Sequence, residues 1–539
     1  MRITELLGNR IVLFDGAMGT AFQSAGLSGG ELPLYNIERP DVVQAVHRDY
    51  LKAGSDILSA NTFEANGLKL AGSGHTVREV IAAAMRNCKA VIDDFGGGAF
   101  AALDIGPSGK LMDMGDGFDF DAAYELYREQ VVAGAESGAD LILFETFSDI
   151  VELKAGVLAA KEHADLPVFC SLTFEGNGRT LMGTDPVTAV RMFQDMGVDA
   201  VGVNCSLGPE GMLPLIREMA AVSKIPVLAQ PNAGLPQIRD GVTRYDVDAG
   251  AFTDCMTEIL ESGAAAIGGC CGTDPSYIEM LSARLAKADD AEQRERFPAL
   301  RGDWRAKKVV DSAPSACAVT GSVVMDGRAR IIGDRLDPAR NGEFAEALRA
   351  GNDAYTVKEA LEQARAGADI VLVRADLPGV DEEEALLRLV RRISAKGKIP
   401  LMIECGTPAH AERAAKYCRG KVILGAVDGR RASMDAYFPI AAKYGLAVVV
   451  RTRDETGIPA DAASRFAILE RLLAEAGKYG IGKDRILADA SPPAASGGSE
   501  AENAAEASEA AAQTEERFGV RATARAFARR NDHGTTELG

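Results

Sequence analysis

Residues 265–273, with the sequence AAIGGCCGT, join a short apolar run to two glycines and two adjacent cysteines. The same order of features, an apolar run that ends in polar residues or glycines and leads into an amphipathic helical stretch, recurs through residues 1–290. The eight strands predicted in this way are Ile11–Phe14, Ile57–Ser59, Phe100–Leu103, Leu141–Phe144, Val168–Leu172, Ala200–Val203, Val227–Ala229 and Ala265–Ile267. Eight β/α units favour an α/β fold closed into a (β/α)8 TIM barrel.

An open doubly wound sheet is the alternative fold for this region. That fold calls for a glycine-rich phosphate-binding turn after an early strand. The nearest candidate, Asp15–Thr20 with the sequence DGAMGT, has neither the GxGxxG spacing nor the lysine of a P-loop. The closed barrel is therefore the better interpretation.

Polar residues gather where the predicted strands end. In a TIM barrel these strand ends form the active face, so their side chains are the candidates for function. They are Asp15, Asn61 with Thr62, Asp104, Glu145 with Thr146, Asn204 with Cys205, and Cys270 with Cys271.

Three of these residues, Cys205, Cys270 and Cys271, are candidate zinc ligands. Neighbouring residues in a strand point to opposite faces, so Cys270 and Cys271 can share a metal only if the strand breaks, and Gly268 and Gly269 supply that break. Three thiolates leave a fourth zinc position open, which is the mark of a catalytic site. Single free cysteines are usually small core residues, and this reading applies to Cys88, Cys170, Cys255, Cys317, Cys405 and Cys418.

Composition excludes several classes of function. A formal net charge of −19 disfavours a nucleic-acid partner, and 47% hydrophobic with 25% charged residues is typical of a globular protein. We expect no membrane span, because no apolar run approaches the ~20 residues that one requires. The first residues carry no signal-peptide core, and the cysteines form no disulfide framework, so we expect a reduced, cytoplasmic protein.

The motifs of residues 1–290 resemble the homocysteine S-methyltransferase family. The matching stretches are Gly202–Cys205, Gly268–Thr273, Asp15–Thr20, Asn61–Phe63, Phe144–Thr146, Gly183–Pro186 and Gln230–Gly234. The resemblance implies that Cys205, Cys270 and Cys271 bind Zn2+ and that the substrate is homocysteine. It also implies a substrate-binding set, which comprises Asp15, Gly16, Ala17, Met18, Gly19, Asn61, Glu145, Thr146 and Asn204.

The implied reaction needs no catalytic acid or base from the chain. A free thiol with a pKa of ~8.5 is only a few per cent ionised at pH 7, a deficit of about 2 kcal/mol. A zinc-bound thiol is deprotonated outright and can accept a methyl group to give methionine. None of the five histidines lies in a candidate motif, which agrees with a metal-activated thiolate.

A charged, irregular linker is predicted over residues 291–318, and a second α/β series over residues 319–490. The second series resembles the pterin-binding barrel of cobalamin-dependent methionine synthases, through stretches such as Gly333–Pro338 and Asp454–Pro459. Its ligand positions differ, however, since Arg374 and Glu404–Cys405 stand where the family has amide and carboxylate pterin ligands. Methyltetrahydrofolate binding is therefore doubtful, because each missing partner costs ~1–3 kcal/mol.

Residues 491–539 are predicted to be a low-complexity tail, with 494–512 disordered, so the second barrel is expected to be incomplete. No cobalamin-binding motif is present, so methylcobalamin would be supplied in trans by a partner corrinoid protein. Two alternatives remain open, a transferase that uses S-methylmethionine and a non-catalytic zinc-binding assembly subunit.

Overall fold

The computed structural model describes residues 2–27, 32–112, 117–239, 242–287, 289–301, 313–328, 330–489, 491, 500–523 and 535–538. The chain divides into two compact units, Met1–Val309 and Val310–Gly539. Each carries its own parallel sheet, so each is described by itself.

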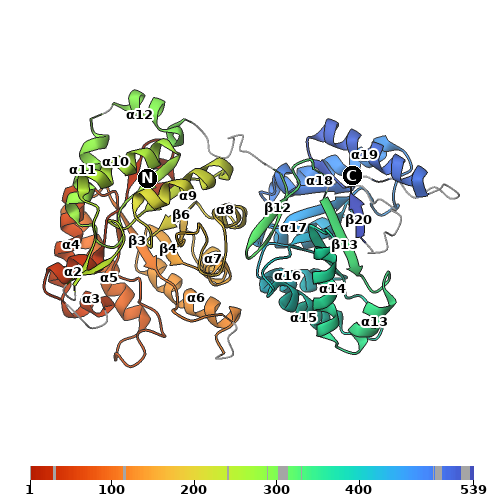
Figure 1. Ribbon diagram of the computed structural model, residues 1–539, viewed down its shortest axis with the longest axis horizontal. Coiled ribbons are helices and arrows are strands. Elements are labelled where there is room, and N and C mark those ends of the chain that lie inside the picture. Colours follow the sequence, from red (N-terminus) through yellow and green to blue (C-terminus); the bar gives the residue numbers. More distant parts are fainter. Residues whose placement is uncertain are drawn as a thin grey trace. The chain divides into compact units, whose positions relative to one another are not determined.

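The first unit is a closed parallel barrel, and all eight predicted strands are present (Figure 1). They are β1 (Val12–Leu13), β2 (Ile57–Ser59), β3 (Phe100–Ile105), β4 (Leu141–Phe147), β5 (Val168–Leu172), β6 (Ala200–Asn204), β7 (Val227–Gln230) and β10 (Ala264–Ile267). The sheet runs β1-β10-β7-β6-β5-β4-β3-β2, and a parallel bridge between Phe14 and Ile57 closes it. The prediction of a TIM barrel is confirmed, and the doubly wound alternative is excluded.

Helices surround these strands in Figure 1. They are α1 (Ile3–Leu6), α2 (Met18–Ser24), α3 (Tyr35–Glu38), α4 (Pro40–Ala53), α5 (Val77–Asp94), α6 (Phe120–Glu136), α7 (Ile150–His163), α8 (Pro186–Asp195), α9 (Pro209–Val222), α10 (Ala249–Glu261), α11 (Pro275–Leu285) and α12 (Asp290–Arg296). Six of them begin at an aspartate whose side chain accepts a hydrogen bond from the first turn, namely Asp119, Asp149, Asp185, Asp248, Asp274 and Asp289. These caps set where each helix starts after its loop.

The interior of the first barrel is filled by side chains of alternating size. Phe14 and Phe169 are fully buried beside the small residues Ala102, Ala200 and Ala266. The barrel is thus a packed core, and its free volume lies at the loop-bearing end.

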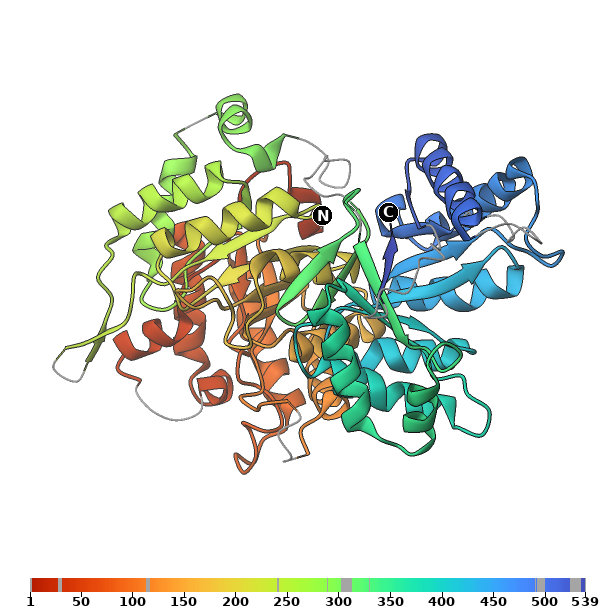
Figure 2. The same cartoon turned by 45° about the vertical axis from the view of Figure 1, so that its right-hand side comes forward.

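In the described part of the second unit, seven parallel strands form a sheet that does not close into a barrel. They are β13 (Arg330–Leu336), β14 (Ile370–Val373), β15 (Leu401–Glu404), β16 (Ile423–Asp428), β17 (Ala447–Arg451), β18 (Ile486–Asp489) and β19 (Arg521–Ala522). The edge of β13 that would meet the last parallel strand is paired instead with an antiparallel strand, β20 (Thr535–Leu538), as Figure 2 shows. The prediction of an incomplete second barrel is confirmed.

The helices of the second unit alternate with its strands. They are α13 (Gly342–Arg349), α14 (Asp353–Arg365), α15 (Glu382–Ser394), α16 (Pro408–Tyr417), α17 (Arg431–Lys443), α18 (Ala462–Lys478) and α19 (Glu500–Phe518), and a short hairpin, β11 (Ser315–Ala318) and β12 (Gly321–Val324), precedes β13. Among the described helices of the whole chain, none is long and apolar enough to cross a membrane.

Two expectations from composition were wrong in part. The predicted linker contains most of α12 and all of β11, and the predicted disordered stretch lies largely in α19, while residues 494–499 are outside the described part. Alanine and glutamate are strong helix formers, and α19 buries Ala507, Ala510 and Thr514 at helical spacing. A biased composition therefore forms a packed helix here, because one face of it is apolar.

Candidate metal centre and substrate cavity

The three candidate zinc ligands come together at the loop-bearing end of the first barrel. Cys205 follows β6, and Cys270 and Cys271 follow β10. Their Sγ atoms all lie within 4.8 Å of one another, and those of Cys205 and Cys271 are 4.0 Å apart. Tetrahedral zinc with Zn–S bonds of ~2.3 Å separates its sulfurs by ~3.8 Å, so the set fits three positions of a zinc ion.

Backbone contacts with the end of β7 hold the cysteines in place. The amide of Cys205 donates to the carbonyl of Gln230 at 3.0 Å, and the amide of Cys270 donates to the carbonyl of Pro231 at 2.8 Å. Cys205 has a left-handed backbone, with φ of 59°. A residue other than glycine rarely adopts this conformation unless its surroundings enforce it, so the turn after β6 is a specific feature of the site.

The glycine pair before Cys270 allows the strand to break, because β10 ends before it. A Cβ atom on Gly268 would lie 2.6 Å from Cβ of Phe14, and one on Gly269 would lie 2.3 Å from Oγ1 of Thr273. That hydroxyl donates to the carbonyl of Cys270 at 2.7 Å. Only glycine leaves room for Phe14 and Thr273 to pack this closely against residues 268 and 269. This close packing fixes the position of the turn that carries Cys270 and Cys271.

The three thiols share their protons unequally. Hydrogen bonds from Cys205 and Cys270 lower the pKa of Cys271 to about 3, whereas contacts with Cys205 and then Cys271 raise the pKa of Cys270. Without a cation, the site therefore favours one thiolate, on Cys271, and two neutral thiols, on Cys205 and Cys270. A divalent cation would allow all three to ionise, which is the chemistry of a cysteine zinc site.

A cavity of about 460 Å³ opens beside the cysteines and is lined by all three. It is also bounded by the loops that follow β1 and β2 and by the C-terminal end of β4. The predicted substrate residues that line it are Asp15, Gly16, Ala17, Met18, Gly19, Asn61, Glu145 and Thr146.

Asp15 enters the cavity from the end of β1 and is almost fully buried. Its carboxylate accepts hydrogen bonds from the amide of Ser59 at 2.8 Å and from the hydroxyl of Ser59 at 2.9 Å. Burial nevertheless raises the pKa of Asp15 to about 7. The loss of water outweighs the two hydrogen bonds, so the carboxylate is poised to accept a positive charge.

Glu145 and Asp104 lie with Asp15 in the cavity, whose lining also includes Glu64, which forms an ion pair with Lys69. Burial, followed by the charges of Asp15 and Cys271, raises the pKa of Glu145 to about 8. Burial and the charge of Glu145 raise the pKa of Asp104 well above its ordinary value. Among the described residues, Oδ1 of Asp104 has no hydrogen-bond partner. An ammonium group in the cavity would relieve this repulsion and satisfy that oxygen.

Two amide side chains from the predicted substrate set hold the loops. The side chain of Asn61 donates to the carbonyl of Leu32 at 2.8 Å, although Asn61 also lines the cavity. Asn204 is fully buried and does not line the cavity. Its carboxamide contacts Thr146 and Ser171 instead, so the structure places it behind the site rather than in it.

Several cavity residues were absent from the predicted substrate set. Asp104 and Gln230 stand at strand ends, the same signal that identified Asp15 and Glu145. Tyr245 does not line the cavity, but it follows the β8–β9 hairpin (Gln237–Arg239 and Val242–Arg244), and its ring packs over Gly272 beside the cysteines, where a Cβ would lie 2.3 Å from Cδ2 of the ring. No periodicity in the sequence marks this contact.

Two family models match the chain. The model described as homocysteine S-methyltransferase matches residues 12–285, and the model described as pterin binding enzyme matches residues 340–523.

Individual proteins are similar over large parts of the chain. A methionine synthase of Mycobacterium tuberculosis (strain ATCC 25618 / H37Rv) is 28% identical over 513 residues, which are 90% of this chain and 42% of that protein. This chain therefore spans less than half the length of that relative.

Solved structures are similar to parts of the chain. The homocysteine methyltransferase MmuM from Escherichia coli, in its oxidized form, has 23% identity and a TM-score of 0.44 and covers 51% of this chain and 96% of its own. A dihydropteroate synthase of Xanthomonas albilineans has 20% identity and a TM-score of 0.29, and covers 39% of this chain and 77% of its own.

Proposed function

The chain belongs to the homocysteine S-methyltransferase family, and from this premise we propose that it transfers a methyl group to the sulfur of homocysteine to form methionine. The observation that carries the proposal is that one cavity brings together three cysteine sulfurs, which lie within 4.8 Å of one another, and the carboxyl groups of Asp15, Asp104 and Glu145. One end of that cavity suits a thiolate on a metal, and the other suits an ammonium group.

Cys205, Cys270 and Cys271 are the residues that would hold Zn2+. When bound, zinc supplies a Lewis acid that favours the thiolate form of a substrate sulfur at neutral pH. The open side of the cysteine set faces the cavity, so the substrate sulfur can approach from there.

The carboxyl groups of Asp15, Asp104 and Glu145 would hold the amino group of homocysteine. Their raised pKa values mean that protons occupy them in part when the cavity lacks a cation. An ammonium group would replace those protons and fix the orientation of the substrate, so that its sulfur points to the cysteines. Orientation of this kind supplies a large part of the rate in a two-substrate reaction.

The donor we propose is methylcobalamin on a partner corrinoid protein. Four exposed leucines lie on loops at the same face as the cysteines, namely Leu68, Leu111, Leu181 and Leu235. Apolar side chains around a mouth favour a macromolecular surface over a small polar donor. A reduced cytoplasmic setting belongs to this proposal, because Cys205, Cys270 and Cys271 can bind zinc only as reduced thiolates.

The test is methionine formation by the zinc-loaded chain from homocysteine, with methylcobalamin and S-methylmethionine supplied in parallel. Turnover with methylcobalamin supports the corrinoid route. Turnover with S-methylmethionine alone replaces it by a stand-alone transferase, and turnover with neither supports the assembly-subunit alternative. A Cys271→Ser variant is the control, since it should abolish turnover with either donor.

A further inference from the structure

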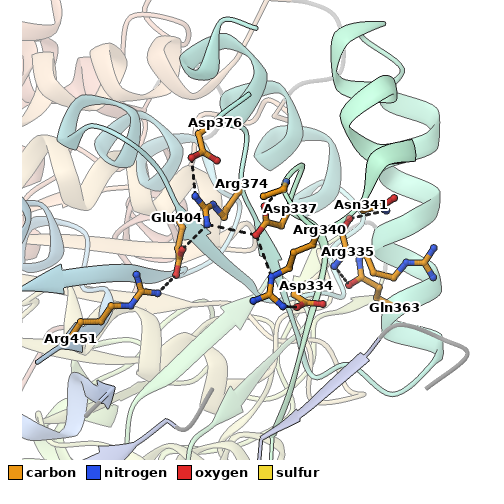
Figure 3. Close-up of polar contacts among 11 residues, drawn as sticks. Asp334, Arg335, Asp337, Arg340, Asn341, Gln363, Arg374, Asp376, Glu404 and Arg451 are labelled. Atoms are coloured by element: carbon orange, nitrogen blue, oxygen red, sulfur yellow. Dashed lines mark hydrogen bonds and ion pairs between the residues drawn. The ribbon is translucent and has the colours of Figure 1, made fainter. Parts of the chain in front are cut away.

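A series of ion pairs joins the carboxyl ends of five of the parallel strands in the second unit, and Figure 3 shows it from Asp337 to Arg451. Its members alternate in charge along the sheet. They are Asp337 after β13, Arg374 after β14, Glu404 at the end of β15, Arg451 at the end of β17 and Asp489 at the end of β18.

Arg374 is the centre of the series. Its Nη1 atom lies 3.6 Å from Oδ2 of Asp337 and 3.6 Å from Oε2 of Glu404, and its Nη2 atom donates to Oδ2 of Asp376 at 2.8 Å. Figure 3 shows its guanidinium between these three carboxylates. One side chain therefore neutralises groups from three successive strand ends.

Arg451 extends the series to the other side of Glu404. Its Nη2 atom donates to Oε1 of Glu404 at 2.6 Å. Its Nε atom lies 3.4 Å from Oδ2 of Asp489, as an ion pair without the alignment of a hydrogen bond. Glu404 is thus held from both sides by guanidinium groups.

Two further arginines at this end pair with carboxylates in the same way. Arg340 contacts Asp334 at 2.7 Å and Asp337 at 3.6 Å, and Arg430 contacts Asp428 at 2.7 Å. Each of these arginines stands on a loop close to the strand end that it neutralises.

The carboxylates are buried and need such partners. Asp337, Glu404 and Asp489 are each at most 9% exposed. A buried carboxylate that loses its partner is strongly destabilising, so some donor must always face it. A guanidinium presents two adjacent N–H groups to a carboxylate, and the aminopyrimidine edge of a pterin presents the same pattern.

We propose that the second unit is a self-occupied site, in which Arg374 and Arg451 take the place of the donor edge of a ligand and leave no pterin binding. The unit then acts as a structural domain whose strand ends are joined by its own arginines. This inference is independent of the cysteine site, because it concerns only residues of the second unit.

The test uses the full chain, an Arg374→Ala variant and a matched control, Arg413→Ala. Arg413 pairs with Glu383 at an exposed position on α16, so its loss removes an arginine without baring buried carboxylates. Thermal unfolding is followed for all three with low-millimolar guanidinium chloride and with sodium chloride at equal ionic strength. Methyltetrahydrofolate is titrated into the wild-type chain by calorimetry.

The expected result is a fall in Tm of about 5–15 °C for Arg374→Ala, against less than ~2 °C for the control. Added guanidinium should raise the Tm of Arg374→Ala part of the way back to the wild-type value and leave the other two proteins unchanged. The wild-type chain should show no saturable heat of binding with methyltetrahydrofolate. Equal stability of the two variants, equal rescue by sodium chloride, or saturable micromolar binding of the folate would each overturn the proposal.

An Arg374→Lys variant covers the case in which Arg374→Ala does not fold. Lysine keeps the charge but cannot present paired N–H groups to two carboxylates. The Tm of Arg374→Lys should fall less than that of Arg374→Ala. Guanidinium should not raise it, because the lysine ammonium occupies the place of the Arg374 guanidinium. A lysine variant as stable as the wild type would contradict the bridging role of Arg374.

Discussion

The carboxamide of Asn204 holds Thr146 by two hydrogen bonds. Its Oδ1 atom accepts from the backbone amide of Thr146 at 2.8 Å, and its Nδ2 atom donates to Oγ1 of Thr146 at 2.8 Å. Oδ1 also accepts from the hydroxyl of Ser171 at 2.7 Å, so one side chain joins the ends of β4, β5 and β6. Thr146 has φ of 68°, and this contact holds it in that left-handed conformation beside the cavity.

Replacement of Asn204 by alanine should therefore weaken the site without removing a cavity residue. Each buried donor left unpaired costs about 1–3 kcal/mol, and the loop at Thr146 would lose its support. We expect a lower urea midpoint and a raised KM for homocysteine, while bound zinc stays near the wild-type amount. Unchanged stability in Asn204→Ala would contradict the role of Asn204 in holding Thr146.

Replacement of any one of Cys205, Cys270 and Cys271 by serine should lower zinc affinity by more than about 100-fold, because even supporting residues of metal sites contribute 10–100-fold. Metal content after dialysis, measured by mass spectrometry, checks this. Cys255→Ser is the matched control, since that thiol is half-buried on α10 and should leave the zinc content unchanged. If the three sulfurs bind one zinc ion, the three Cys→Ser variants should lose zinc to the same extent.

Replacement of Glu145 by glutamine should remove the preference for an amino group in the substrate. A charge-assisted contact contributes roughly 1.5–3 kcal/mol, which is about 10–100-fold in affinity. We expect the wild-type chain to bind homocysteine more tightly than 4-mercaptobutyrate, which lacks the amino group. The ratio of the two Kd values should shrink in Glu145→Gln, and a constant ratio would place the amino group elsewhere.

The free energy of unfolding of the first unit should fall in mild acid because of His47. It is fully buried on α4, both ring nitrogens lack partners among the described residues, and burial lowers its pKa to about 4. Because the folded pKa is below the unfolded value of ~6.5, stability is complete above pH 6.5 and falls as the pH drops toward 4. The loss at pH 5 should be about 2 kcal/mol.

Urea unfolding of the wild type and of His47→Phe at pH 7.5 and pH 5 measures this contribution. The difference between the two pH values should be smaller in His47→Phe, since phenylalanine cannot take up a proton. His75→Phe is the control, because His75 is only partly buried. If the wild type and His47→Phe lose stability equally between these pH values, His47 is not the cause.

Much of the first unit could be predicted from local sequence pattern. Short apolar runs and intervening amphipathic stretches determine strands and helices, and their regular alternation leaves few topologies. The cysteine set could also be predicted, because strand ends of a barrel meet at one face and Gly268 with Gly269 break the strand before Cys270. The composition of α19 led to a wrong prediction of disorder. A stretch rich in alanine and glutamate forms a helix when one apolar face packs against the rest of the unit.

The sequence by itself determined the strand order of the first barrel, the face on which its polar residues gather and the three sulfurs that share it. Only the tertiary structure decided that Asn204 supports Thr146 from behind, that Asp104 joins Asp15 and Glu145, and that Arg374 lies among the carboxylates of the second unit. The reason is physical. Periodicity records which side of its own element a residue faces, whereas hydrogen bonds and ion pairs depend on distances between elements far apart in the chain.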